Sequence, residues 1–167
     1  CVPGIEAATG SLGHGLSIST GIALASKMNG IPFSVVSLLS DGECNEGSTW
    51  EAALLAPVHK LNNLIAIVDF NKWQATGRSA EVTALEPLEE KFEAFGWNSL
   101  RIDGHDFRQI KSALETAKDS DKPFAIIADT IKGKGIKTME DDNNWHYRIP
   151  TKEEVDSAFA ELGIESL

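Results

Sequence analysis

The sequence predicts an α/β protein with a doubly wound, mostly parallel sheet and helices on both faces. Two continuous apolar runs of strand length, Phe33 to Leu39 and Leu64 to Phe70, have the composition of strands covered on both sides in a parallel sheet. Helical segments alternate with such runs, which implies right-handed crossovers. With 42% apolar and 24% charged residues among 167, the composition is that of one ordinary globular domain.

The first half of the chain is predicted to form two helices and two strands. Residues 16–27 have the small and apolar side chains of a buried helix, which Gly30-Ile31-Pro32 ends. After the first strand, residues 46–61 read as a second helix. Pro57 would remove the hydrogen bond to the carbonyl of Ala53, so we expect a bend near the middle of this helix.

The second half continues the same alternation. We expect helices over residues 86–95, 107–117 and 152–162, and strands over residues 97–102 and 124–130. The last helix begins with a capping box, Thr151 with Glu154, and stops at Gly163. His105 stands in a polar cluster between a strand and a helix and is interpreted as structural.

Charge and cysteine usage limit the partners and the compartment. The net charge of −10 argues against nucleic acid or an anionic membrane as a partner, and no run of eighteen apolar residues is present. Cys1 and Cys44 have neither metal-ligand spacing nor a disulfide framework, so the reducing cytoplasm is expected. The chain starts at Cys1 and enters a motif within ten residues, so we expect upstream sequence to be missing.

Two polar residues follow the first two predicted strands. Asp41, in Ser40-Asp41-Gly42-Glu43, comes after the first strand, and Asn71 comes after the second. Ligands of such sheets bind at the carboxyl ends of strands. One carboxylate and one amide oxygen can hold Mg²⁺ when a diphosphate supplies the other ligands, and Gly42 lets phosphate oxygens approach the backbone. Each residue alone is typical of a turn, but the pair favours a metal and diphosphate site.

Six ordered motifs resemble the amino-terminal, diphosphate-binding domain of transketolases and cover nearly the whole chain. They are Thr9-Gly10-Ser11-Leu12-Gly13, Asp41-Gly42-Glu43 with Glu46-Gly47 and Trp50-Glu51-Ala52, His59-Lys60-Leu61, Asn71, Asp103-Gly104-His105, and Lys132-Gly133-Lys134-Gly135-Ile136 with Trp145-His146. The resemblance implies that residues 1–167 form this domain. It also implies that activity requires a separate pyrimidine-binding domain or carboxyl-terminal subunit, like that of a split transketolase.

The resemblance further implies thiamine diphosphate bound through Mg²⁺, with Ca²⁺ or Mn²⁺ as substitutes. The implied metal ligands are the side chains of Asp41 and Asn71 and the backbone carbonyl of Trp73. The implied cofactor contacts are Gly10, Ser11, Leu12, Asp41, Gly42, Asn71, Lys132 and His146. His146 would also face the donor sugar, and Glu46 would help couple the site to a neighbouring subunit, so these two are the implied catalytic residues. Without the resemblance, Glu46 would be an acid favoured by a helix dipole.

The activity implied is transfer of a two-carbon ketol unit between sugar phosphates, in a dimer or heterotetramer. Trp73-Gln74-Ala75-Thr76 is not the family's commonest sequence after the ligand Asn, and Ser40 replaces its usual Gly. The identities of the donor and acceptor sugars are therefore left open. Alternatives with the same cofactor are 1-deoxyxylulose-5-phosphate synthase and the alpha chain of a 2-oxo-acid dehydrogenase. Another is a non-catalytic subunit that binds the cofactor or a partner only for assembly.

Overall fold

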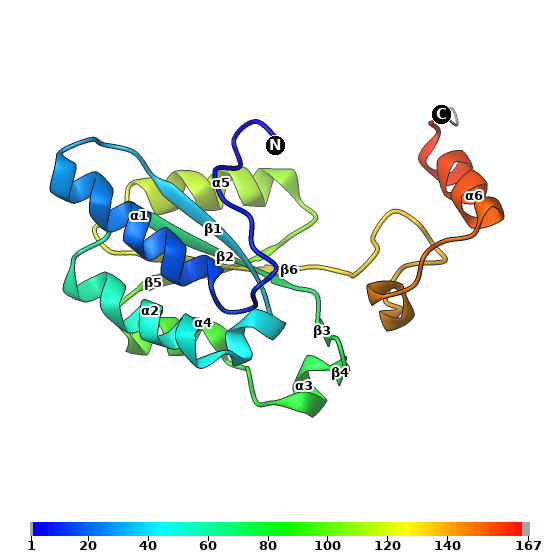
Figure 1. Ribbon diagram of the computed structural model, residues 1–167, viewed down its shortest axis with the longest axis horizontal. Helices are drawn as coiled ribbons and strands as arrows, with labels where there is room; N and C mark the ends of the chain where they lie inside the picture. The colour runs from blue at the N-terminus through cyan, green and yellow to red at the C-terminus, as the bar shows by residue number, and fades with distance from the viewer. Residues whose placement is uncertain (1, 165–167) are drawn as a thin grey trace.

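Four parallel strands form the central sheet in the order β1-β2-β6-β5 (Figure 1). The computed structural model describes residues 2–164. The strands are β1 (Val35–Ser40), β2 (Leu64–Phe70), β5 (Asn98–Asp103) and β6 (Phe124–Asp129). Phe124 lies opposite both Ile65 and Asn98, and Ser40 lies opposite Asp69. The predicted parallel α/β architecture is confirmed.

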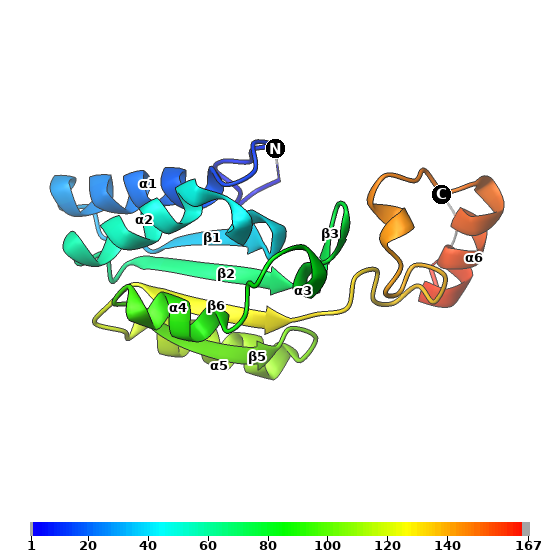
Figure 2. The ribbon, with the colours of Figure 1, turned by 90° about the horizontal axis from the view of Figure 1, so that it is seen from below.

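Helices cover both faces of this sheet. Helices α1 (Gly15–Asn29), α2 (Gly47–Val58) and α4 (Leu88–Ala94) lie on one face, and α5 (Phe107–Lys118) lies on the other (Figures 1 and 2). The remaining elements are η1 (Gly42–Asn45), β3 (Trp73–Gln74), β4 (Gly77–Arg78), α3 (Ser79–Val82), η2 (Asn143–His146) and α6 (Lys152–Leu162). Residues 131–164, with η2 and α6, form a carboxyl-terminal lobe beside the strand ends (Figure 2). No helix in the described part of the chain is long and apolar enough to cross a membrane.

The two faces of the sheet are not covered equally. The larger core packs α1, α2 and α4 against β1, β2 and β6, and it buries Leu16, Phe92 and Trp97. On the other face, α5 covers β5 and β6. β1 is an edge strand that α5 does not cover, so Val36 and Leu38 are 51% and 71% exposed. The prediction that the first strand is covered on both sides is therefore wrong.

Pro57 also acts differently from the prediction. It lies in the last turn of α2, which ends at Val58, so the expected bend near the middle of a longer helix is wrong. The carbonyl of Ala53, which Pro57 leaves without its helical donor, accepts a hydrogen bond from the buried Trp97 Nε1 at 2.8 Å. The helix therefore keeps this carbonyl satisfied through a residue of the neighbouring strand segment.

The final helix agrees with its predicted signals. Thr151 and Glu154 form both hydrogen bonds of the capping box, and Gly163 ends α6 in the left-handed conformation with φ +65°. Helix α4 begins at Leu88, two residues later than predicted, because Pro87 occupies its N-cap in an extended conformation.

Candidate functional site

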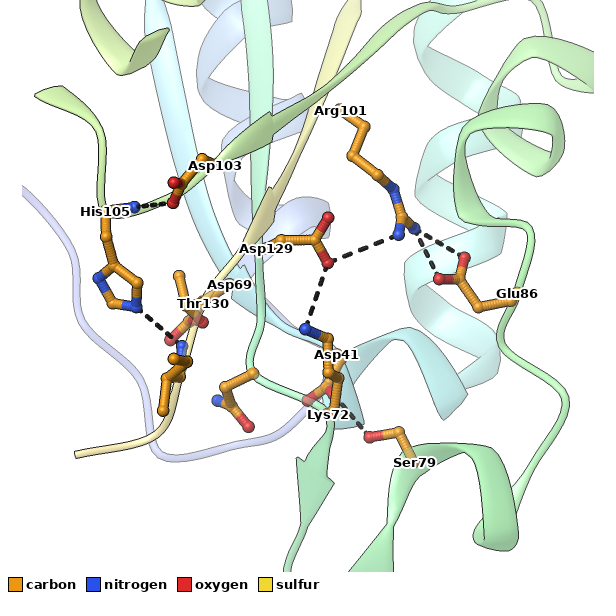
Figure 3. Close-up of polar contacts among 12 residues, drawn as sticks. Asp41, Asp69, Lys72, Ser79, Glu86, Arg101, Asp103, His105, Asp129 and Thr130 are labelled. Atoms are coloured by element: carbon orange, nitrogen blue, oxygen red, sulfur yellow. Dashed lines mark hydrogen bonds and ion pairs between the residues drawn. The ribbon is translucent and has the colours of Figure 1, made fainter. Parts of the chain in front are cut away.

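Asp41 directly follows β1 and is fully buried. Its Oδ1 accepts a hydrogen bond from the Gly42 N–H at 2.9 Å, and its Oδ2 accepts one from Ser79 Oγ at 2.5 Å (Figure 3). Burial raises the pKa of Asp41 above its usual 3.8, although the hydrogen bonds from Ser79 and Gly42 lower it. Asp41 is thus a buried acid held by neutral donors.

Two cations on this side of the sheet, Lys72 and Arg101, pair with carboxylates other than Asp41. Lys72 Nζ lies 3.6 Å from Asp129 Oδ1, and an Arg101 nitrogen lies 3.5 Å from the same oxygen (Figure 3). Arg101 also pairs with Glu86 at 2.7 Å. Within residues 2–164, no Lys, Arg or His forms an ion pair with Asp41. Its charge therefore lacks a protein counter-ion there.

Asn71 lies at the same edge of the sheet, one position after β2. β1 and β2 are neighbours, and the Asp41 N–H donates to the Asp69 carbonyl at 3.3 Å. The Asn71 Oδ1 accepts a hydrogen bond from the Trp73 N–H at 3.0 Å, so the amide is oriented by its own turn. The fold therefore brings the predicted ligands Asp41, Asn71 and Trp73 to one pair of strand ends.

The donor set at this edge fits a hard cation with a phosphate ligand. Among the described residues, no three His, Cys, Asp or Glu side chains are grouped as a metal would require. A cation here would use one carboxylate, one amide oxygen and the Trp73 carbonyl, with phosphate oxygens completing its shell. The uncompensated charge of Asp41 is the observation that favours a cation at this position.

The segment with Gly10, Ser11 and Leu12 is tied to η1. The Oε1 of Glu43 accepts hydrogen bonds from the N–H groups of Gly13, at 3.1 Å, and Gly15, at 3.2 Å. Gly13 has φ +80°, and a Cβ on it would lie 2.6 Å from the Cβ of Glu46. The chain therefore approaches Glu46 closely where only glycine fits. Leu12 itself is 53% exposed.

Lys132 and His146 belong to the carboxyl-terminal lobe. Lys132 follows β6, and its carbonyl accepts a hydrogen bond from the Asp141 N–H at 2.9 Å. His146 ends η2, is exposed, and packs edge-on against Tyr147 with ring centroids 4.6 Å apart. The turn η2 contacts the β3–β4 hairpin, because Asn143 Nδ2 donates to the Gln74 carbonyl at 2.9 Å. Among the described residues, no hydrogen bond or ion pair joins the His146 side chain to Asp41 or Asn71.

Sequence reasoning missed three residues that shape this edge. They are Glu43, Ser79 and Asp141. Glu43 stands two positions after Asp41, and an acid so close to the ligand was the available signal. Ser79 and Asp141 gave none, because their partners lie 38 and at least 63 positions away in the chain.

Two further polar residues near the site have structural roles. His105 Nε2 accepts a hydrogen bond from the Ile131 N–H at 2.8 Å, which supports its structural interpretation. Helix α5 is capped by Asp106, whose Oδ1 accepts from the Arg108 N–H at 2.9 Å.

Burial raises the pKa of the free Cys44 thiol to about 12, so this cysteine is not a nucleophile at neutral pH.

A parallel α/β sheet with a buried acid and an amide at neighbouring strand ends is an arrangement that fits a diphosphate held through a cation. The sequence matches the family "Transketolase, thiamine diphosphate binding domain" over residues 1–166. The chain therefore belongs to the transketolase family, as its thiamine diphosphate binding domain.

Individual relatives agree with this assignment. The chain is 43% identical over 160 residues to one of the subunits of apulose-4-phosphate transketolase from Actinobacillus succinogenes, covering 96% of this chain and 58% of the relative. It is 45% identical over 160 residues to the 6-deoxy-6-sulfo-D-fructose transketolase subunit SqwG of Clostridium sp., covering 95% and 58%. The transketolase structure from Campylobacter jejuni superposes with a TM-score of 0.91 at 36% identity, covering 97% of this chain and 27% of that one. The chain thus spans only part of each relative.

Proposed function

We propose that this chain acts as the diphosphate-binding half of a transketolase, which transfers a two-carbon ketol unit between sugar phosphates with thiamine diphosphate and Mg²⁺. The observation that carries the proposal is the buried carboxylate of Asp41, which has no cationic partner in the described residues and lies beside the Asn71 turn. The names of two relatives, both of them transketolase subunits, support the division into halves.

In this proposal Asp41, Asn71 and the Trp73 carbonyl hold the cation, and Gly42 lies against the diphosphate. A Cβ at Gly42 would meet protein atoms only at 3.7 Å, an ordinary contact, and its φ is not in the left-handed region. The fold itself therefore does not demand glycine here. Since no protein atom crowds Gly42, phosphate oxygens have room to approach its backbone.

The cofactor, when bound, supplies the carbanion stabilisation by which carbon–carbon bonds are cleaved and remade. The segment from Gly10 to Leu12 would contact its rings. Lys132 and His146 would donate hydrogen bonds to phosphate oxygens and to the oxygen of the donor sugar on which negative charge develops. Glu46 would face the neighbouring subunit.

The proposed partner is a pyrimidine-binding subunit or domain, within a dimer or heterotetramer. Sugar phosphates of the pentose phosphate type are the proposed substrate class. Neither nucleic acid nor a membrane is proposed as a partner, because the chain carries a net charge of −10. The buried, free thiol of Cys44 supports the reducing cytoplasm as the proposed compartment.

The test is the replacement Asp41→Ala in the enzyme assembled with its partner. Calorimetry should detect no Mg²⁺-dependent binding of thiamine diphosphate, while the far-ultraviolet circular dichroism stays that of the wild type. Asp103→Ala is the control. Like Asp41, Asp103 lies at the carboxyl end of a strand, but that strand, β5, is on the opposite side of the sheet from β1. Unchanged affinity in Asp41→Ala would refute the ligand assignment.

Turnover separates this proposal from a non-catalytic role in assembly. The assembled enzyme should convert a ketose phosphate donor in the presence of an aldose phosphate acceptor. Cofactor binding without turnover would favour the non-catalytic role. Product formed from pyruvate instead would favour a different thiamine enzyme.

A further inference from the structure

Asp141 fixes the hairpin that follows the proposed metal ligand Asn71. Its Oδ1 accepts hydrogen bonds from Trp73 Nε1 at 2.9 Å and Arg78 Nη1 at 2.7 Å, and its Oδ2 accepts one from Arg78 Nη2 at 2.6 Å. The Arg78 guanidinium also stacks on the Trp73 ring, 3.8 Å from its centroid. One carboxylate therefore holds both β3 and β4, including the residue whose carbonyl is a proposed metal ligand.

The backbone of Asp141 holds the second segment of the proposed site. Its N–H donates to the Lys132 carbonyl at 2.9 Å, and its own φ is +58°. Within this loop Gly133 has φ +73°, and a Cβ there would overlap the carbonyl of Met139. The loop from Lys132 to Asp141 is thus tightly packed, and the Asp141 N–H holds the Lys132 carbonyl within it.

A second set of hydrogen bonds joins the β3–β4 hairpin to the carboxyl-terminal lobe. Asn143 Nδ2 donates to the carbonyls of Gln74, at 2.9 Å, and Ala75, at 3.3 Å. The side chain of Gln74 in turn accepts from Asn45 Nδ2 at 2.5 Å and lies beside Gly42. The hairpin therefore stands between the loop proposed to bind the diphosphate and the loop that carries Lys132.

The Arg78–Asp141 ion pair is exposed, so its effect on the hairpin can be distinguished from its effect on the stability of the whole fold. The side chains of Arg78 and Asp141 are 36% and 52% exposed, and pairs this exposed add little to folding stability. A bidentate pair stacked on an aromatic ring does, however, fix orientation. Hydrogen bonds from Arg78 and Trp73 lower the pKa of Asp141 to about 2, so it remains ionised at neutral pH.

We propose that Asp141 is a positioning residue, which holds the Trp73 carbonyl and Lys132 at the spacing that the metal-bound diphosphate needs. The inference rests on the proposed function and adds to it a residue that contacts neither metal nor cofactor. It acts through Trp73 and Arg78 on one side and through the Lys132 backbone on the other.

The variant Asp141→Asn tests the inference in the assembled enzyme, because it keeps the size of the side chain and removes its charge. Losing such an outer-sphere partner typically weakens metal affinity about 10–100-fold, and we expect that loss for Mg²⁺ in the presence of thiamine diphosphate. Saturating Mg²⁺ should restore most of kcat. A merely structural residue would not give this metal-dependent rescue.

Asp156→Asn is the matched control. The Asp156 carboxylate is 51% exposed and pairs with Lys152 at 2.7 Å on α6, so the same exchange removes a comparable ion pair outside the hairpin. It should leave Mg²⁺ affinity unchanged. Arg78→Lys keeps the charge but loses the bidentate pair, so it should reproduce the Asp141→Asn loss without adding to it in the double variant.

The outcomes separate the two proposals. If Asp41→Ala abolishes cofactor binding while Asp141→Asn keeps wild-type Mg²⁺ affinity, the positioning role is wrong and the proposed function stands. Equal losses in Asp141→Asn and Asp156→Asn, or a loss that added Mg²⁺ does not reverse, would also overturn the positioning role. If Asp41→Ala binds the cofactor normally, the proposed site itself is wrong.

Discussion

At the scale of single residues, burial makes the ionised carboxylate of Asp41 unfavourable for folding unless a cation is bound to it. The pKa of Asp41 is raised in the fold because of burial, so the folded protein binds this proton more tightly than the unfolded chain. The contribution of Asp41 to stability is therefore fully present below pH 3.8, the unfolded value, and is lost as the pH rises through the higher folded value. Without a bound cation, the ionised Asp41 thus lowers the stability of the fold at neutral pH.

The variant Asp41→Asn should consequently stabilise the cofactor-free protein while it destroys the metal site. Its amide oxygen can still accept from Gly42, and its NH₂ can donate to Ser79 Oγ. We expect a gain of about 0.5–2 kcal/mol at pH 8, the usual size for a stabilising exchange. Urea unfolding at several pH values measures it, and the gain should shrink as the pH falls toward 4.

Added Mg²⁺ and thiamine diphosphate provide the internal control in the assembled enzyme. They should stabilise the wild type and leave Asp41→Asn unchanged, since ligand stabilisation requires binding to the native state. A gain in Asp41→Asn that stays constant from pH 4 to pH 8 would contradict the electrostatic explanation.

Sequence reasoning reached the residues that follow strands and missed those whose contacts are distant. Asp41 and Asn71 could be predicted because apolar runs mark the strands and parallel strands end at one edge. Ser79 donates to Asp41 from the first residue of the short helix α3, whose place beside β1 no local pattern reveals. His146 is expected at the site from the resemblance alone, and its place in the lobe depends on a loop that has no hydrophobic periodicity.

At the scale of elements, the end of α2 depends on a pairing between Pro57 and Trp97. The Ala53 carbonyl lacks its helical donor because of Pro57, and the Trp97 indole supplies one at 2.8 Å. Trp97→Phe should therefore leave a buried carbonyl unsatisfied and lower the free energy of unfolding by about 1–3 kcal/mol. In a Pro57→Ala background the helical donor returns, so the same exchange should cost about 1 kcal/mol less.

Trp50→Phe is the control for this cycle. Trp50 Nε1 donates to the Cys44 carbonyl at 2.8 Å, a bond that does not involve Pro57. Chemical denaturation should give Trp50→Phe the same cost in both backgrounds. Equal costs for Trp97→Phe in the two backgrounds would show that its indole does not compensate for Pro57.

The predicted elements were accurate where one local signal decides them and inaccurate where packing decides. The capping box fixed the start of α6, and the apolar run fixed β2 to the residue. The end of α2 was misplaced because proline effects depend on whether the helix continues beyond them. The composition of the first strand could not reveal its edge position, which follows from the order of strands in the sheet.

At the scale of the whole molecule, the match covers the thiamine diphosphate binding domain, whereas the proposed reaction also needs a pyrimidine-binding one. We expect the 167-residue chain alone to show no turnover with thiamine diphosphate, Mg²⁺ and a ketose phosphate. Mixing it with a pyrimidine-domain subunit from the same organism should restore the reaction, which a coupled assay of aldose phosphate release would measure. Turnover by the chain alone would refute the division of labour.

The uncovered side of β1 has a practical consequence for all of these measurements. An edge strand offers unpaired backbone groups, and Val36 and Leu38 place an apolar stripe beside them. We therefore expect purified copies of the chain to associate through this stripe as their concentration rises. Titrations repeated at two dilutions, with light scattering alongside, would keep self-adhesion from being mistaken for weak cofactor affinity.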